Sequence, residues 1–117
     1  MKSLRVPLRA VFYQDEGDWI AHCLEFDLCG DGQTKEEAGA CLEEAVSLQV
    51  RDSLEHHNLG NLFSPADGEF FRMFAAGKDI AMGQLHVDFE GFTIGRTEAR
   101  EYSEDRVSSD RELVATS

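Results

Sequence analysis

The fold of this chain is decided by residues 19–45, which read WIAHCLEFDLCGDGQTKEEAGACLEEA. The first part of this stretch is typical of a strand, with Trp19, Ala21 and Cys23 on one face and Ile20, His22 and Leu24 on the other, so both faces are expected to be largely covered. Gly32 then permits a turn. Thr34 and Glu37 have the spacing of a capping box, in which each side chain accepts a hydrogen bond from the backbone amide of the other residue. A helix is therefore expected to begin after Thr34 and to continue to about residue 57.

Alternating side chains predict three strands ahead of this helix, over residues 4–13, 18–25 and 27–32. A loop over residues 14–17 joins the first two strands as a hairpin. Pro7 has no amide hydrogen to donate, so it favours either an edge position for the first strand or a hydrogen bond that the sheet does not need there. The first half of the chain therefore predicts a small antiparallel sheet.

The second half of the chain predicts one short helix and one more strand. Ser64 followed by Pro65 is typical of a helix start, and Gly77 supplies the stop. Apolar residues then recur over residues 85–94, which predicts a fourth strand that is bent or turned at Gly91.

Together these elements predict an α+β fold in β-β-β-α-β order. They include one long helix, whose apolar stripe contains Leu42 and Leu48, and a short extra helix. We expect a single domain over residues 1–97. A polar C-terminal extension is expected over residues 98–117, with a short helix at residues 97–106.

The composition is strongly acidic, since 23 Asp and Glu against 11 Lys and Arg give a net charge of -12. Such a charge repels nucleic-acid phosphates, and it either suits a basic partner protein or serves solubility alone. No apolar stretch resembles a signal peptide or a membrane span, so the cytoplasm is the expected location. The three cysteines lack Cys-x-x-Cys spacing and are expected to be reduced, buried thiols: Cys23, Cys29 and Cys41.

A set of residues between positions 4 and 58 has a distinctive spacing that covers the hairpin exit, the next two strands and the helix: Gly17, Trp19, Ala21, residues 23–28, 32–34 and 36–38, Leu42, Ala45 and Leu48. This pattern resembles the N-terminal domain of the HicB family of antitoxins and the solitary HicB-like proteins grouped with them. The resemblance implies an open antiparallel sheet of three to four strands with the long helix packed across one face. The exposed edges of such sheets commonly pair between subunits, so a homo-oligomer is implied.

HicB-like antitoxins cover a small basic RNA-cleaving toxin, and they often bind their own operator through an added C-terminal segment. The second half of this chain has neither a helix-turn-helix pair nor a basic ribbon followed by helices, so DNA binding is not predicted. Four arginines, Arg5 and Arg9 on a strand and Arg96 and Arg100 on the expected last helix, lack interleaved aromatic residues. The expected function is a non-enzymatic, antitoxin-like protein-binding module, and the alternative is a solitary HicB-like oligomer with an unknown ligand.

Three acids ahead of the helix, Glu25, Asp27 and Asp31, are the candidate partner-binding residues, because their charge would steer a basic partner. The family's domain resembles part of a ribonuclease H sheet, so the same carboxylates could instead hold magnesium in a nuclease. We favour the binding role. In an extended strand Glu25 and Asp27 lie on one side, and Asp31 joins them there to share a metal only if the strand has no bulge. No metal or cofactor is expected. The turn and cap residues are expected to be structural: Gly32, Thr34 and Glu37.

Overall fold

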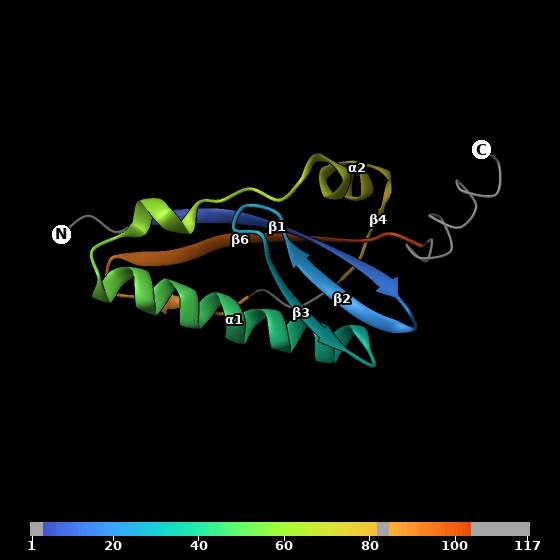
Figure 1. The fold of residues 1–117 in the computed structure, drawn as a ribbon, viewed down its shortest axis with the longest axis horizontal. Coiled ribbons are helices and arrows are strands. Elements are labelled where there is room, and N and C mark those ends of the chain that lie inside the picture. Colours follow the sequence, from blue (N-terminus) through green and yellow to red (C-terminus); the bar gives the residue numbers. More distant parts are fainter. Residues whose placement is uncertain (1–3, 82–84, 104–117) are drawn as a thin grey trace.

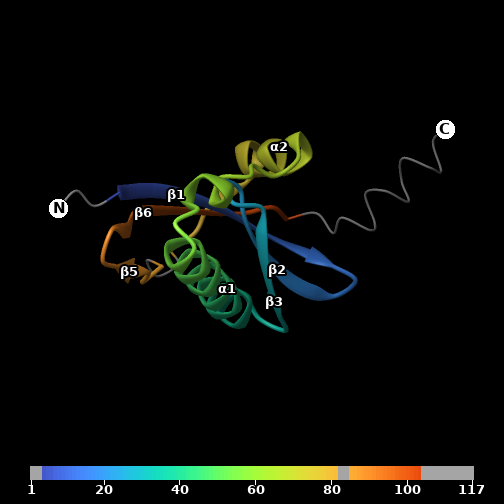
Figure 2. The ribbon, with the colours of Figure 1, turned by 60° about the vertical axis from the view of Figure 1, so that its left-hand side comes forward.

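The computed structural model describes residues 4–81 and 85–103. A sheet carries a long helix on one face and a short helix on the other (Figures 1 and 2). The strands are β1 (Leu4–Asp15), β2 (Asp18–Cys23), β3 (Leu28–Gly32), β4 (Lys78–Asp79), β5 (Asp88–Phe89) and β6 (Phe92–Glu101). The helices are α1 (Lys35–Glu55) and α2 (Gly68–Ala76), with a 3-10 turn, η1 (Leu59–Leu62), between them.

The strands form one mixed sheet in the order β3-β2-β1-β6-β4, and β5 also pairs with β6. The first three strands are antiparallel neighbours. In contrast, β6 runs parallel to β1, with Leu4 opposite Phe92 and Phe12 opposite Glu101. The α+β class, the long helix and the short extra helix are confirmed.

The expected antiparallel sheet of three to four strands is corrected to a mixed sheet of six described strands. The β-β-β-α-β order covers only the longest elements, since α2, β4 and β5 lie between α1 and β6. The physical reason for the parallel pair is the long connection after β3. It carries the chain back to the end of the sheet where β1 starts, and a crossover of a dozen or more residues permits parallel pairing.

Pro7 lies in a central strand, because β1 is placed between β2 and β6. The edge position considered for it is therefore wrong. The pairing of β1 with β6 shifts register between Val6 and Leu8, which places Pro7 at the irregularity. The β1 step from Val6 to Leu8 lies opposite a longer step from Ile94 to Thr97, so the extra residue belongs to β6. The hydrogen-bond ladder is interrupted beside Pro7, and a missing amide hydrogen is tolerated there.

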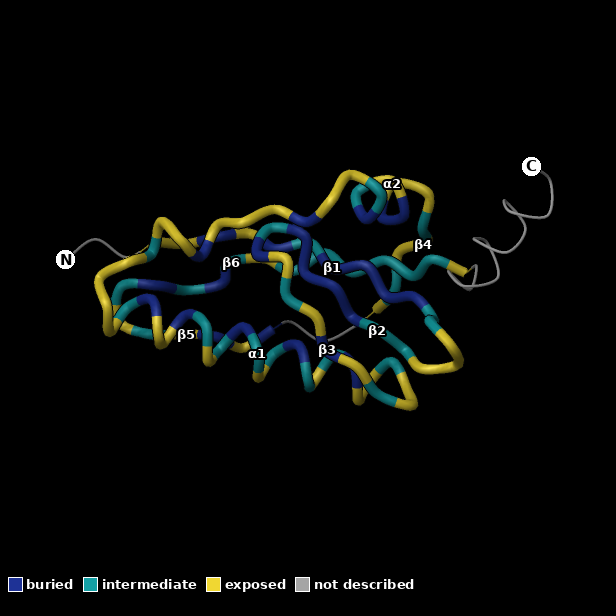
Figure 3. The backbone as a smooth tube through the Cα atoms, viewed as in Figure 1, coloured by how far each residue is buried: buried dark blue, intermediate teal, exposed yellow. Residues whose placement is uncertain are grey.

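Both faces of the sheet carry an apolar core (Figure 3). Adjacent residues of β1, such as Val11 and Phe12, point to opposite faces and are both buried. The larger core joins the strands to α1 and includes Phe12, Ala21, Cys23, Ala38, Leu42, Val46, Val50 and Phe92. The smaller core joins the opposite face to α2 and includes Val11, Tyr13, Leu24, Phe70, Met73 and Phe74.

The short helix α2 begins later than expected, at Gly68 rather than at Pro65. Residues 64–67 instead form a connection in which the Ala66 backbone N–H donates to the Leu24 carbonyl oxygen at 2.8 Å. The helix ends before Gly77, as expected. The apolar run after it turns at Gly91, whose φ is 96°, so that β5 and β6 form a hairpin.

The strand β6 continues to Glu101, past the expected end of the domain at residue 97. The short helix expected over residues 97–106 is therefore wrong for residues 97–101, which pair with β1 along this strand. The first residues of the expected polar extension over residues 98–117, residues 98–101, belong to β6 and therefore to the sheet. Residues 104–117 of that extension lie outside the described residues.

Candidate functional site

The three candidate acids lie at the β2–β3 turn and on β3, and each contacts a different side chain. Glu25 Oε2 lies 2.7 Å from Arg9 Nε, and Glu25 Oε1 accepts from the Arg9 backbone N–H at 2.8 Å. Asp31 Oδ1 lies 3.8 Å from Cys41 Sγ. Residues 24–27 form a turn rather than continuous strand, so alternation does not describe how Glu25 and Asp27 are oriented.

Asp27 belongs to a polar chain that runs into the smaller core. Asp27 Oδ1 lies 2.7 Å from His22 Nε2, and His22 Nδ1 lies 3.4 Å from the Tyr13 hydroxyl. His22 is 3% exposed, and its ring centroid is 4.2 Å from that of Phe70. Asp27 itself has a φ of 54°, in the left-handed region. The contacts among Asp27, His22 and Tyr13 therefore hold the β2–β3 turn beneath α2. They also give the polar atoms of the buried His22 ring the partners that buried polar groups need.

The turn and cap residues lie together where α1 begins. The Glu37 backbone N–H donates to Thr34 Oγ1 at 3.1 Å. The Glu37 carboxylate accepts from the Gln33 backbone N–H at 3.1 Å, one residue before the amide that the capping box predicts. A Cβ at Gly32 would lie 2.5 Å from the Glu37 Cβ, so the close approach of α1 requires glycine there. These contacts fix the junction between β3 and α1.

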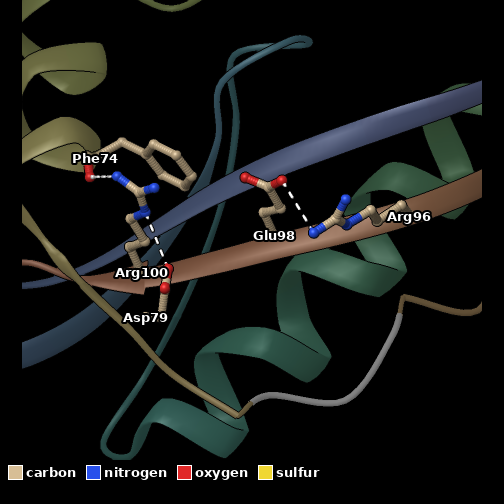
Figure 4. Close-up of polar contacts among 5 residues, drawn as sticks. All are labelled: Phe74, Asp79, Arg96, Glu98 and Arg100. Atoms are coloured by element: carbon tan, nitrogen blue, oxygen red, sulfur yellow. Dashed lines mark hydrogen bonds and ion pairs between the residues drawn. The ribbon is translucent and has the colours of Figure 1, made fainter.

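The two arginines of β6 are paired with acids of this chain (Figure 4). Arg100 Nε lies 3.1 Å from Asp79 Oδ1, and Arg100 Nη1 donates to the Phe74 carbonyl oxygen at 3.1 Å. Its guanidinium carbon also lies 4.4 Å from the centre of the Phe74 ring. Arg96 Nη2 lies 3.5 Å from Glu98 Oε1. Arg96 and Arg100 therefore lie on a strand and not on the expected last helix. The contacts of Arg100 join β6 to β4 and α2.

The exposed side of α1 carries most of this helix's acids. We define the α1 outer face by six of the eight exposed residues of α1: Glu37, Glu44, Leu48, Arg51, Asp52 and Glu55. Spacings of three, four and seven residues place these side chains along one side of a helix. Leu48, which the apolar stripe predicts to be buried, is 56% exposed. The outer face is therefore an acidic surface with one apolar side chain near its middle.

A cavity of about 300 Å³ lies between the first half of α1 and the sheet. Its apolar lining comes from Ala10 and Phe12 of β1, Leu42 of α1, Ala99 of β6, and Leu85. Two further lining residues, Glu36 and Glu43, are seven positions apart on α1 and so lie on the same side of the helix. Only weak signals for this cavity are present in the sequence, because its lining comes from four separate parts of the chain: residues 10–12, 36–43, 85–86 and 97–99.

The three cysteines differ in burial. Cys23 is buried, Cys41 is half-buried, and Cys29 is exposed on β3, so the expected burial of all three is wrong. Cys29 pairs with His22 of β2 on the sheet face that α2 covers only in part. Burial raises the pKa of the Cys23 thiol to about 12.

Alkylation should separate these thiols. Near pH 8 we expect iodoacetamide to modify Cys29 in the folded protein and to leave Cys23 unmodified, because the thiolate is the reactive form. Mass spectrometry with and without urea measures the occupancy, and equal labelling rates in the folded protein would contradict the assignment. The unfolded thiol ionises near pH 9.0 and the folded one near 12. The contribution of this thiol to stability is therefore complete below pH 9 and is lost as the pH rises through this window.

No group of three or more His, Cys, Asp or Glu side chains that could hold a metal ion occurs among residues 4–81 and 85–103. Neither helix in that part of the chain has the length and apolarity needed to cross a membrane. No family model, curated protein or solved structure matches this chain. The candidate function therefore depends on surface chemistry and on the arrangement of the strands and α1.

Proposed function

We propose that this chain is a non-enzymatic, HicB-like protein-binding module whose partner is a small basic protein, as the toxin is for an antitoxin. The observation that carries the proposal is the α1 outer face, where Glu37, Glu44, Asp52 and Glu55 are exposed beside a single basic residue, Arg51. The succession of β1, β2, β3 and α1 supports the resemblance. A partner that cleaves RNA would place both proteins in the cytoplasm.

Charge and shape on this face suit a basic partner. The chain's net charge of -12 attracts cationic proteins at long range, and exposed acids on one face orient the encounter. Leu48 supplies an apolar contact that a partner can exclude from water, within a rim of charged residues. The helix that carries these groups is 21 residues long and is anchored on the sheet by its buried side, so the surface is already formed before binding.

The proposal assigns the attraction of a basic partner to acids of α1, and not to Glu25, Asp27 and Asp31, which the sequence predicted. Glu25 is held by Arg9 through two contacts, and Asp27 is in contact with His22. A carboxylate already paired within the chain has less attraction left for a partner. The exposed Glu44 and Glu55 of α1 therefore fit the binding role better than Glu25 and Asp27, whereas Asp52 is itself paired with His56 at 3.3 Å.

Binding to the protein encoded by the adjacent gene tests the proposal. Isothermal titration against a small basic product is expected to give a complex that weakens as salt is raised, because exposed charges are screened beyond about 10 Å at 0.1 M. The variant E44K/E55K should weaken binding by about tenfold or more, since like charges then face the partner. The matched control E16K/D67K changes the net charge equally, at two exposed residues outside α1, one on the β1–β2 turn and one just before α2.

Two results would contradict this function. One is a neighbouring gene set without a small basic product and no effect of this protein on RNA cleavage by any neighbour's product. The other is an equal loss of binding for E44K/E55K and E16K/D67K, which would leave only net charge and no binding face.

The alternative, a solitary oligomer, is favoured by one feature of the sheet. β3 ends the sheet on one side within the described part of the chain, with β2 as its neighbour. An edge strand presents backbone groups that can pair with a second copy. Size-exclusion chromatography with light scattering should then give a dimer or larger species, and a monomer at about 100 µM, well above the micromolar range of ordinary specific association, would remove this alternative.

A further inference from the structure

The cavity beside α1 has a structural cause. α1 packs mainly on β3 and β2, so its first half leaves β1 and β6 partly uncovered on that face. The side of the helix that faces this gap carries small residues, Gly39 and Ala40. The resulting volume of about 300 Å³ is about twice that of an engineered apolar cavity that accepts benzene. It also reaches the lower end of the range for ligand pockets.

The lining of this cavity combines an apolar body with negative charge. Phe12, Leu42 and Leu85 are each less than 10% exposed and supply apolar walls. Glu36 and Glu43 supply two carboxylates from one side of α1. None of the lining residues among 4–81 and 85–103 is Lys or Arg, so these carboxylates have no Lys or Arg partner within that lining.

The wall formed by residues 85 and 86 is held in place from both sides. The His86 backbone N–H donates to Glu43 Oε2 at 2.8 Å, which ties this wall to α1. The Leu85 backbone N–H donates to Thr97 Oγ1 at 3.4 Å, which ties it to β6. Glu43 is thereby oriented while its charge is kept, since a backbone amide does not neutralise a carboxylate. The cavity is therefore framed by contacts within the described chain.

We propose that this cavity binds a small organic cation with a flat apolar body. The apolar part lies between Phe12, Leu42 and Leu85, and the ammonium lies beside the carboxylates of Glu36 and Glu43. Burial of the apolar part contributes affinity, and the two carboxylates select a cation over a neutral or anionic molecule of the same shape. This site shares no residue with the α1 outer face, so its test does not require the proposed protein partner.

Three probes of one shape and different charge test the proposal: benzylamine, benzyl alcohol and benzoate. Titration followed by two-dimensional NMR of the folded protein should show benzylamine binding with a dissociation constant of about 1 mM or tighter, with shifts at Ala40, Leu42 and Ala99. Benzyl alcohol should bind at least about threefold more weakly, and benzoate should not bind, because the mouth is negative.

Two pairs of variants locate the binding. E36Q/E43Q should weaken benzylamine binding by about tenfold and remove its advantage over benzyl alcohol, whereas E44Q/E55Q, with the same loss of charge on α1, should leave it unchanged. Ala99→Leu should fill the cavity and abolish binding of both molecules, with folding checked by the dispersion of the same spectra. Glutamine at position 43 keeps an oxygen that can accept from the His86 amide.

Several results would overturn the proposal. These are equal affinity for benzylamine and benzoate, unchanged binding in E36Q/E43Q, or shifts that lie on the α1 outer face instead of around the cavity. No protein partner is needed in this experiment, so its failure leaves the proposed protein-binding function standing, and the reverse also holds.

Discussion

Replacing Gly30 with alanine is expected to lower the free energy of unfolding by about 3 kcal/mol or more. A Cβ at this position would lie 2.2 Å from the Leu42 backbone nitrogen and 2.5 Å from the Ala38 carbonyl oxygen. Both are main-chain atoms of α1, so no change of rotamer can relieve the clash. Either β3 or the helix must move, and the larger core between them then loses its packing.

Urea unfolding followed by circular dichroism measures this effect, with Gly60→Ala as the matched control. An added Cβ at Gly60 meets no atom within 4 Å, so the same substitution should change stability by no more than about 0.5 kcal/mol there. A Gly30→Ala variant as stable as Gly60→Ala would show that α1 does not lie against β3 as described.

Replacing Phe92 with alanine is expected to cost about 3–5 kcal/mol of stability. Phe92 is fully buried, opens β6 and pairs with Leu4 of β1. Its ring centroid lies 6.3 Å from that of Phe26, which closes one end of the larger core. Deleting the ring leaves a cavity at the point where the parallel pair begins.

Phe63→Ala is the control for this prediction. Like Phe92, Phe63 contacts the Phe26 ring, at a centroid distance of 5.4 Å, but Phe63 is 42% exposed. Its loss should cost no more than about 1–2 kcal/mol, since a half-exposed ring gives up less burial. Thermal and urea unfolding of both variants measure the difference. Equal costs would mean that β6 does not complete the core.

Local features of the fold were predictable from the sequence. The start of α1 follows from Thr34 and Glu37, which are close in sequence and make a contact that depends on no other part of the chain. The hairpin between β1 and β2 turns at Glu16 and Gly17, both with positive φ, as a two-residue turn requires. Such signals lie within a few residues of the structure that they specify.

Features that depend on distant partners were not predictable. Alternation in β6 identifies a strand, but it does not say that the neighbour is β1 or that the pair is parallel. Glu25 reads as a free acid until Arg9, 16 residues away, is placed beside it. The periodic pattern places Leu48 in the apolar stripe of α1, but it does not reveal how wide a strip of the helix the sheet covers, and Leu48 is exposed. In the candidate site, the cavity lining is likewise assembled from separate segments.

The parallel pair of β1 and β6 also has a consequence for how the chain reaches its native state. Leu4 pairs with Phe92, so the first and last described strands must find each other across most of the polypeptide. Contacts between residues so far apart carry a large loop-closure entropy and slow the folding reaction. During synthesis, β1 and β2 can pair as soon as they emerge. The edge of β1 that pairs with β6 stays unpaired until β6 has been made. A nascent chain therefore exposes backbone groups that can pair with other chains until translation has passed Glu101.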